Sequence, residues 1–351
     1  MSDLKTYGYN TFSEIFVSVS TENIGRVTTV NKTNYKIITE SGFKTGELTG
    51  QMLYSLSPSE LPQTGDWVEI INYAESCIIT KVLPRKTTLL RKTAGRTSDV
   101  QILATNIDTA LIVQGLDRDF NINRLERITV ALLDAKIKCI IVMNKIDLDP
   151  DWQSKVEKVQ NRLPDITIIA ISALNNTAID TIQKQLIPQQ TYIMIGSSGA
   201  GKSTLLNQLV KKEIQQTQTI STSVGKGRHT TTHREMFVLS NGSLLIDSPG
   251  VREFGLALSD SDSVTTSFSD IKYLSEKCKY KNCTHTNEPG CAILSALEDG
   301  SLLIEEYNSY LKLRNEAIHY QQTVQEKKKK GKNLAKLIKD MKNKNMKKRY
   351  D

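Results

Sequence analysis

The chain has 351 residues, of which 38% are hydrophobic and 24% charged, and a formal net charge of +8. This length favours two or three domains, and the composition excludes a disordered protein because it supplies enough apolar residues for a core. The apolar runs are shorter than the ~20 residues that cross a bilayer, five cysteines make no disulfide framework, and the N-terminus lacks a signal-peptide pattern. We therefore expect a cytoplasmic protein with no membrane partner.

The first region, residues 1–100, is predicted to be an all-β domain. Short segments rich in β-branched or aromatic residues alternate there with glycine-containing turns. The predicted strands are Ile24–Val30, Tyr35–Thr39, Glu47–Leu53, Trp67–Ile71 and Cys77–Val82. Strands of this length and spacing favour a small antiparallel barrel or sandwich. A group of basic residues follows, which forms either a nucleic-acid-facing edge or an ordinary solvated surface: Arg85, Lys86, Arg91, Lys92 and Arg96.

In the second region, residues 101–260, apolar runs alternate with segments of helical period. The predicted strands are Thr109–Val113, Cys139–Met143, Ile166–Ile171, Tyr192–Ile195 and Leu244–Ile246. The predicted helices are Arg124–Ala135, Ile179–Leu186 and Lys202–Leu209. Strand–helix alternation with buried strands implies a parallel sheet that carries helices on its faces.

A phosphate-binding loop is predicted at G-S-S-G-A-G-K-S, residues 196–203, between a predicted strand and a predicted helix. Glycines allow backbone N–H groups to approach phosphate oxygens, and the helix N-terminus adds its positive end. We expect Lys202 to reach the β- and γ-phosphates and the Ser203 hydroxyl to bind Mg²⁺. The predicted phosphate-binding residues are Gly196, Ser197, Ser198, Gly199, Ala200, Gly201, Lys202, Ser203 and Thr204.

A base-recognition motif, N-K-x-D, follows the predicted strand that ends at Met143, and it comprises Asn144, Lys145, Ile146 and Asp147. The Asp147 carboxylate can accept hydrogen bonds from N1–H and the 2-amino group of guanine, and adenine offers neither donor. Lys145 is expected to lie against the base, and Asn144 to tie this loop to the phosphate loop. Together with the phosphate loop, the motif predicts GTP and GDP as ligands.

Three further segments complete the predicted site. Ser172 and Ala173 end a strand, where the Ala173 N–H is placed to read guanine O6. In D-S-P-G, Asp247 is predicted to hold Mg²⁺ through water, and the N–H of Gly250 to sense the γ-phosphate. Thr231, between the two phosphate-side motifs, is predicted to complete the Mg²⁺ coordination as a switch loop orders over GTP.

The residue after D-x-x-G is Val251, where many GTPases carry the glutamine that orients the attacking water. An aliphatic side chain cannot orient water, so we expect slow unaided hydrolysis that a partner stimulates. His229 is the internal candidate for a catalytic residue, because its charge is tunable near neutral pH. A histidine without a chemical role is the alternative.

The order of the motifs is unusual. The base-recognition motif at residues 144–147 precedes the phosphate loop at 196–203 and the D-x-x-G segment at 247–250, whereas in the usual small GTPase it follows both. Circular permutation still permits the sheet to form, because the termini of a domain often lie close together. The segment after Gly250 then leads directly into the C-terminal region.

The third region, residues 261–325, contains four potential metal-ligating residues within fourteen positions: Cys278, Cys283, His285 and Cys291. Three thiolates and one imidazole form the closed tetrahedral set typical of structural zinc, so one structural Zn²⁺ is expected. A redox role or coincidence is the alternative.

Two further features of composition lie outside the motifs. Cys77 and Cys139 lie in apolar strands and are expected to be core thiols. A helical stripe is predicted near the end of the third region, at Ile304, Tyr307, Leu311 and Ile318.

The basic charge is concentrated in a tail, residues 326–351, which holds 12 basic and 3 acidic side chains. The rest of the chain is therefore nearly neutral. Such a tail attracts phosphate groups without regard to sequence and in a salt-dependent way. Its apolar residues at helical spacing predict a basic amphipathic helix on contact: Leu334, Leu337, Ile338 and Met341.

Together these features resemble the RsgA (YjeQ/YloQ) family of circularly permuted, ribosome small subunit-dependent GTPases. The resemblance rests on N-K-x-D before G-x-x-x-x-G-K-S, on R-H-T-T-T, on D-S-P-G-V-R-E-F and on C-x4-C-x-H-x5-C. It implies a multidomain fold: an N-terminal OB-like β-barrel over 1–100, an α/β P-loop GTPase with permuted motif order over 101–260, and a mostly helical zinc-binding domain over 261–325. It also implies GTP hydrolysis in late maturation of the small (30S) ribosomal subunit, with 16S rRNA as a partner and hydrolysis stimulated by the subunit.

Two other functions stay open on the residues alone. One is an RNA-binding assembly module in which GTP is mainly structural, and the other is a P-loop kinase or ATPase that acts on a small molecule. Asp147 argues against the second, because its carboxylate matches guanine. We expect a monomer.

Overall fold

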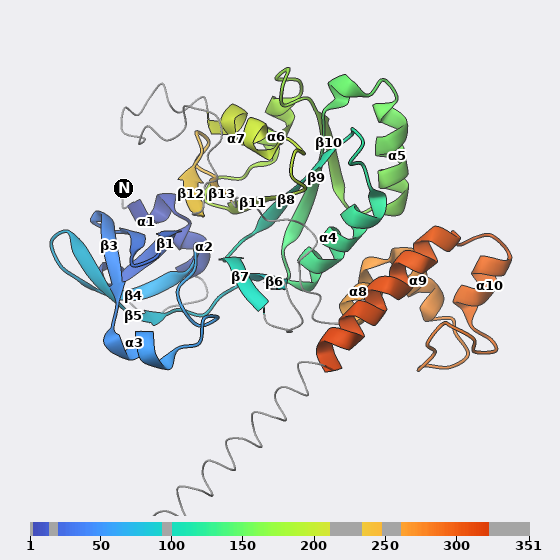
Figure 1. Cartoon of the computed structure of the whole chain (residues 1–351), viewed down its shortest axis with the longest axis horizontal. Helices are drawn as coiled ribbons and strands as arrows, with labels where there is room; N and C mark the ends of the chain where they lie inside the picture. Colours follow the sequence, from blue (N-terminus) through green and yellow to red (C-terminus); the bar gives the residue numbers. More distant parts are fainter. Residues whose placement is uncertain (1–2, 14–19, 93–99, 211–233, 248–260, 323–351) are drawn as a thin grey trace, which may run out of the picture. The chain divides into compact units, whose positions relative to one another are not determined.

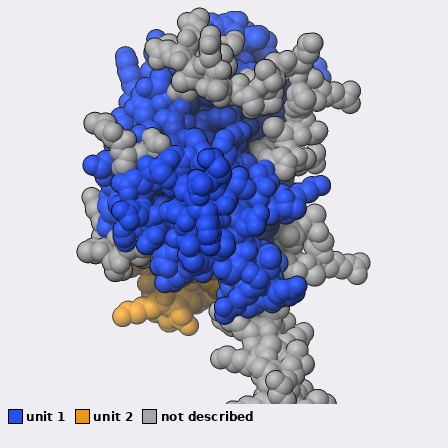
Figure 2. Space-filling model, turned by 90° about the vertical axis from the view of Figure 1, so that its left-hand side faces the viewer, with its two compact units in different colours: residues 1–94, 100–257 blue, residues 95–99, 258–351 orange. Residues whose placement is uncertain are grey.

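The computed structural model describes residues 3–13, 20–92, 100–210, 234–247 and 261–322 of the chain. The chain divides into two compact units, residues 1–94 with 100–257 and residues 95–99 with 258–351 (Figure 2). In the described ranges, no helix combines the length and the apolar character that crossing a membrane requires.

The first unit begins with a closed five-stranded barrel (Figure 1). Its strands are β1 (Ile24–Val30), β2 (Tyr35–Thr39), β3 (Gly42–Leu48), β4 (Trp67–Asn72) and β5 (Ser76–Val82). β1 pairs with both β2 and β4, and β3 pairs with β5, which closes the barrel. The β3–β5 pairing is parallel, so the barrel is mixed and not the purely antiparallel one predicted. The barrel itself and four of its five predicted strands are confirmed.

The predicted strand Glu47–Leu53 is wrong, because the chain turns there into a short helix. β3 ends at Leu48 and α3 spans Gly50–Ser55. Thr49 caps this helix, since its hydroxyl accepts a hydrogen bond from the Met52 N–H at 3.2 Å. Thr49 and Gly50, which lie inside the predicted strand, instead start a helix.

A layer that sequence analysis missed covers one end of the barrel. It consists of helices α1 (Asp3–Thr6) and α2 (Tyr9–Ser13) and a 3₁₀ turn, η1 (Thr21–Asn23). Phe12 stacks on Trp67 with 4.8 Å between ring centroids, and both belong to one apolar cluster with Leu4, Ile24 and Leu83. Cys77 lies in the separate cluster inside the barrel, as expected of a core thiol, and burial raises its pKa to about 11.

The central part of the first unit is an α/β sheet. Its strands are β8 (Thr109–Gly115), β9 (Lys138–Asn144), β10 (Thr167–Ile171), β11 (Thr191–Ile195), β12 (Glu235–Val238) and β13 (Leu244–Asp247). They lie in the order β10-β9-β8-β11-β13-β12, and all adjacent pairs are parallel except β13 with β12. The predicted parallel sheet is confirmed, and sequence analysis did not predict the antiparallel strand β12.

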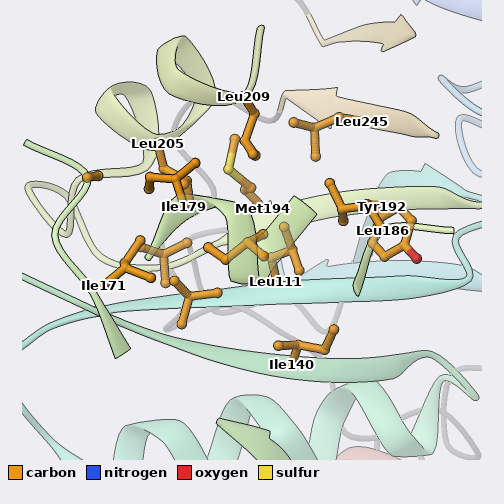
Figure 3. Close-up of a cluster of buried hydrophobic side chains, with 14 of the residues drawn as sticks. Leu111, Ile140, Ile171, Ile179, Leu186, Tyr192, Met194, Leu205, Leu209 and Leu245 are labelled. Carbon is orange, nitrogen blue, oxygen red and sulfur yellow. The ribbon is translucent and has the colours of Figure 1, made fainter. Parts of the chain in front are cut away.

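Helices lie on both faces of this sheet (Figure 1). They are α4 (Ile122–Asp134), α5 (Trp152–Arg162), α6 (Ile179–Gln185) and α7 (Lys202–Val210), with a 3₁₀ turn η2 (Ile146–Leu148). Ile179 and Leu209, from α6 and α7, meet Met194 of β11 in one buried cluster (Figure 3). Cys139 of β9 points to the other face, where it contacts Thr129 of α4, and burial raises its pKa to about 11. α5 was not predicted.

The barrel and the α/β sheet are joined in two ways. A two-stranded antiparallel sheet, β6 (Thr88–Lys92) with β7 (Val100–Thr105), leads from one to the other. β12 also pairs with β1 of the barrel, with Glu235 opposite Thr29, so the strands form one sheet. Two basic residues before β6 form ion pairs in this region: Arg85 with Asp66 at 2.8 Å and Lys86 with Asp108 at 3.1 Å. These pairs favour a structural role for Arg85 and Lys86 over a nucleic-acid-facing one.

The second unit is mostly helical in its described part. It contains α8 (Ser261–Ser267), α9 (Ser269–Ser275), α10 (Ala292–Glu298) and a helix over 304–322. The last helix was predicted, but its buried stripe is Tyr307, Tyr310, Leu313 and Ala317. Ile304 is exposed and Leu311 only half-buried, so the predicted stripe was rotated by part of a turn from the packed face.

Candidate nucleotide site and four-ligand cluster

The predicted phosphate loop, Gly196–Gly201, lies between β11 and α7, at the C-terminal end of a fully buried strand. The Nζ atom of Lys202 donates to the backbone oxygens of Gly196 and Ser197, each at 2.6 Å. The ammonium group is therefore held inside the curve of the loop, where a phosphate group would meet it. Ser198, Gly199 and Ser203 are exposed at the rim.

Gly201 is a position where only glycine fits. Its φ is +97°, and a Cβ atom there would lie 2.1 Å from Nδ2 of Asn144. Asn144 is buried and hydrogen-bonded at both ends of its amide, so it cannot move aside without losing these bonds. The glycine directly before Lys202 is thus required by the Asn144 side chain of the base-recognition motif.

Asn144 joins three loops. Its Nδ2 atom donates to the backbone oxygen of Ala200 at 2.8 Å, and its Oδ1 atom accepts from the Ala173 N–H at 3.0 Å. The first of these bonds is the tie to the phosphate loop that the sequence predicted. In the second bond, the donor is the Ala173 N–H that we expected to donate to guanine O6. The contact with guanine O6 stays a prediction, and it requires the Ala173 N–H to be shared between O6 and Oδ1 of Asn144.

The other members of the base-recognition motif lie at the rim of the sheet. Lys145 has a left-handed backbone, with φ +71°, and its Nζ atom contacts Oδ2 of Asp117 at 2.5 Å. This hydrogen bond is the main cause that lowers the pKa of Asp117. Ile146 is half-buried, and Asp147, in the turn η2, is exposed, so its carboxylate is open to a ligand. Ser172 is buried, and its hydroxyl accepts from the Asn175 N–H at 3.1 Å.

Asp247 ends β13, which runs parallel to β11 with Ile193 opposite Ile246. This strand pairing places Asp247 at the same edge of the sheet as the phosphate loop. His229, Thr231 and Gly250 lie outside the described residues, and so does Val251. The described part of the site therefore comprises the loops that follow β9, β10 and β11 and the end of β13, all at the carboxyl edge where open α/β sheets bind their ligands.

One loop of this edge was missed by sequence analysis. It joins β8 to α4, and it carries Asp117 and Asp119, which contact Lys145 and Ser197. Burial acts against the charged form of Asp119, but hydrogen bonds from Arg124 and Ser197 outweigh it, and the pKa of Asp119 is lowered. Both contacts join residues far apart in the chain, so no local pattern reveals them.

The second unit brings together all four predicted metal ligands. The sulfur atoms of Cys278, Cys283 and Cys291 and a ring nitrogen of His285 lie within 4.8 Å of one another. Nδ1 of His285 is 3.6 Å from the sulfurs of Cys278 and Cys291, and those two sulfurs are 3.9 Å apart. Tetrahedral zinc with ordinary bond lengths separates sulfur from sulfur by about 3.8 Å and sulfur from nitrogen by about 3.6 Å. The cluster thus fits a four-coordinate metal.

The groups around the cluster hold its ligands in place. Burial, the largest cause, raises the pKa of Cys283 to about 12, so a thiolate there requires a nearby cation. The backbone oxygen of His285 accepts from the Tyr307 hydroxyl at 2.6 Å. Glu288 closes the loop between the ligands, because its carboxylate accepts from the Thr284 and Thr286 N–H groups at 2.7 and 3.1 Å.

The fold and the two recognition loops define the class of protein. A parallel sheet with a phosphate loop after β11 and N-K-x-D after β9, joined through Asn144, is the architecture of a P-loop GTPase. Since N-K-x-D comes first in the chain, the GTPase is circularly permuted. The sequence matches the family described as RsgA GTPase over residues 82–257, and the chain belongs to the RsgA family of GTPases.

Relatives extend this match over almost the whole chain. The protein is 41% identical to "Small ribosomal subunit biogenesis GTPase RsgA 1" of Bacteroides thetaiotaomicron, across 97% of each chain. It is 39% identical to the protein of the same name from Listeria innocua, across 90% of each chain. A second family, described as 50S ribosome-binding GTPase, matches residues 191–345. That match begins at β11 and does not include the base-recognition motif.

Two solved structures share the fold. YjeQ from Thermotoga maritima superposes with a TM-score of 0.63 at 23% identity, over 84% of this chain and 98% of that one. YloQ, described as a circularly permuted GTPase, gives a TM-score of 0.61 at 20% identity, over 85% of this chain and 95% of that one. These likenesses confirm the predicted combination of barrel, α/β GTPase and helical region.

Proposed function

We propose that this protein binds and hydrolyses GTP during late maturation of the small ribosomal subunit, and that the subunit stimulates hydrolysis. The observation that carries the proposal is the Asn144 amide, which links N-K-x-D to the phosphate loop in a chain of this family. The small subunit is chosen because relatives matched over nearly their full length carry it in their names. The 50S description belongs to a match over residues 191–345 alone.

In this proposal the bound nucleotide spans the carboxyl edge of the sheet. Asp147 reads the guanine, Lys202 and the N–H groups of the phosphate loop hold the phosphates, and Ser203, Thr231 and Asp247 bind Mg²⁺. Lys202 already lies at the carbonyl groups of its loop, which supports this assignment. His229 is proposed to position water, since Val251 cannot.

The other proposed partners follow the division of the chain. We assign residues 1–100 to the OB-like barrel, 101–260 to the GTPase, 261–325 to a domain with one structural zinc, and 326–351 to a basic tail. The barrel and the tail are proposed to contact 16S rRNA, and the protein is proposed to act as a cytoplasmic monomer. A tail of this charge binds phosphate backbones without sequence preference, which suits a large rRNA surface.

Hydrolysis of GTP should increase when purified small subunits are added. The measurement is phosphate release by the full chain with and without subunits, beside Lys202→Ala, which removes the ammonium that neutralises phosphate charge. We expect stimulation for the wild type and turnover near background for Lys202→Ala in both conditions. No stimulation would refute the coupling to the subunit, and GTP binding without turnover would favour a structural role for GTP.

One zinc ion per chain should be found, and its removal should loosen the second unit. Cys291→Ser should lose the ion and gain protease cleavage between residues 278 and 291, because zinc binding there supplies folding free energy. Cys139→Ala is the matched control, since Cys139 is a core thiol of the first unit and should leave the zinc content unchanged. A chelator that strips no zinc and alters no cleavage would contradict the assignment.

A further inference from the structure

The loop that joins β8 to α4, residues 116–121, lies between the two recognition loops; we call it the β8–α4 loop. β8 pairs with β9 on one side and β11 on the other. Its C-terminal end therefore lies between the strand that ends at Asn144 and the strand that leads into the phosphate loop. No residue of this loop belongs to either recognition motif, yet it contacts both.

Its first contact is with the base-recognition motif. The Nζ atom of Lys145 lies 2.5 Å from Oδ2 of Asp117, and the Leu116 N–H donates to the backbone oxygen of Asn144 at 2.9 Å. A Cβ at Gly115 would lie 3.5 Å from Cδ of Lys145, so the lysine stem lies against the backbone there. Asp117 therefore fixes the head group of the lysine that is to lie against the base.

Its second contact is with the phosphate loop. The Ser197 hydroxyl donates to Oδ2 of Asp119, and the Arg124 guanidinium binds both oxygens of the same carboxylate at 2.9 Å. Gln114, which is buried, accepts from Arg124 at 3.2 Å and donates to the backbone oxygen of Asp119 at 3.0 Å. A bidentate pair supported by a buried amide leaves the Asp119 carboxylate one orientation, and Ser197 takes its position from it.

Both carboxylates carry a cation of their own. Asp117 is paired with Lys145 and Asp119 with Arg124, so neither presents an uncompensated negative charge to a nucleotide phosphate. An acidic pair next to a phosphate loop would otherwise oppose GTP. The arrangement suits residues that hold other residues in place and do not touch the nucleotide themselves.

We propose that Asp117 and Asp119 are positioning residues for nucleotide binding: Asp117 orients Lys145 toward the base, and Asp119 orients the first turn of the phosphate loop through the Ser197 hydroxyl. The β8–α4 loop thereby sets the separation between base recognition and phosphate recognition. A nucleotide joins its base and phosphates through one ribose, so both loops must be held at a fixed distance to bind it with full affinity. This inference rests on the proposed GTP binding.

A double-mutant cycle on the full chain tests whether Asp119 positions the phosphate loop through Ser197. The affinities for GTP, GDP and GMP are measured. Ser197→Ala should weaken GTP and GDP binding about tenfold, the usual scale for a lost charge-assisted hydrogen bond. Asp119→Asn should weaken both at least as much, and the double variant no more than Asp119→Asn, because both changes break one contact. Asp165→Asn, an exposed carboxylate, is the control and should change nothing.

The comparison with GMP separates positioning from a general loss of structure. GMP lacks the β- and γ-phosphates that the phosphate loop holds, so Asp119→Asn should weaken GMP binding far less than GTP binding. Asp117→Asn acts on the base side and should weaken all three nucleotides about equally. The proposal would be overturned if the affinity losses of Ser197→Ala and Asp119→Asn multiplied in the double variant. It would also be overturned if Asp119→Asn weakened GMP and GTP binding equally. A wild type that bound no guanine nucleotide would overturn the proposed function itself.

Discussion

Replacing Gly201 with alanine should lower the affinity for GTP and GDP by more than about 100-fold, which corresponds to about 2.7 kcal/mol of binding free energy. Two effects combine. A Cβ would lie 2.1 Å from Nδ2 of Asn144, and the backbone φ of +97° is strained for any residue with a side chain. Asn144 must then move, and its hydrogen bonds to Ala200 and Ala173 are lost together.

The matched control for this change is Gly242→Ala. Gly242 also has a positive φ, +80°, but a Cβ there meets no atom closer than 3.7 Å. It lies in the turn between β12 and β13, where alanine should cost about 1 kcal/mol of stability and leave affinity unchanged. Equal losses of affinity in the two variants, measured by titration with a fluorescent guanine nucleotide, would show that backbone strain alone matters and that the contact with Asn144 does not.

The parts of the fold that could be predicted are those where the signal is local. The central strands are buried on both sides and appear as continuous apolar runs, so their bounds were predicted to within one or two residues, as for Cys139–Met143 against the observed Lys138–Asn144. The phosphate loop could be predicted because its backbone geometry requires glycine at fixed positions: a Cβ at Gly196 or at Gly201 would lie 2.1 Å from a neighbouring atom. The grouping of Cys278, Cys283, His285 and Cys291 could be predicted because their types and spacing suffice, without knowledge of the rest of the unit.

The errors and omissions arise where packing decides the outcome. Thr49 caps a helix in a local β-rich context that resembles a strand. In the helix over 304–322, Tyr310 is buried and Ile304 exposed, because the packed face is set by α8 and the four-ligand cluster and not by hydrophobicity alone. Asp117 and Asp119 act on partners 28 and 78 positions away, which no spacing rule connects.

The permuted order of motifs was predictable, and the structure explains why it is harmless. The neighbours of β8 are β9 and β11, and both pairings are parallel, so both recognition loops lie at one edge whatever their order in the chain. Permutation changes what is joined to the sheet at its ends. Here β12 pairs with β1 of the barrel, which joins the α/β sheet to the barrel. Arg26, which lies in β1, is the most deeply buried arginine among the described residues.

Replacing Arg26 with methionine should destabilise the first unit by about 3–5 kcal/mol, because four buried acceptors lose their donor at a cost of about 1 kcal/mol or more each. Arg26 lies in β1, and its guanidinium donates to acceptors in several segments of the unit. They are the backbone oxygens of Tyr7, Gly65 and Asn106 and the hydroxyl of Thr191, at 2.6, 3.3, 3.3 and 2.9 Å. Burial lowers the pKa of Arg26 to about 10, which still leaves it charged at pH 7.

Methionine has nearly the length of arginine but donates no hydrogen bond, so it fills the space and leaves four buried acceptors without this donor. Replacing both members of a buried ion pair with apolar residues often leaves stability unchanged. Most partners of Arg26 are backbone oxygens, so no second substitution can remove them. The variant Arg26→Lys should recover part of the stability, because an ammonium reaches fewer of these acceptors than the planar guanidinium. Lys32→Met, at an exposed turn, is the control for loss of charge alone.

Urea unfolding followed by tryptophan fluorescence measures this effect, because the Arg26 guanidinium lies 5.3 Å from the centre of the Trp67 ring. The transition midpoint should fall for Arg26→Met, fall less for Arg26→Lys and stay constant for Lys32→Met. If the unfolding free energy of Arg26→Met lay within about 0.5 kcal/mol of the wild type, the buried hydrogen bonds of Arg26 would not be what holds the barrel to the sheet. Because Thr191 begins the strand that ends at the phosphate loop, a loss of GTP affinity with unchanged stability would instead assign Arg26 to nucleotide binding.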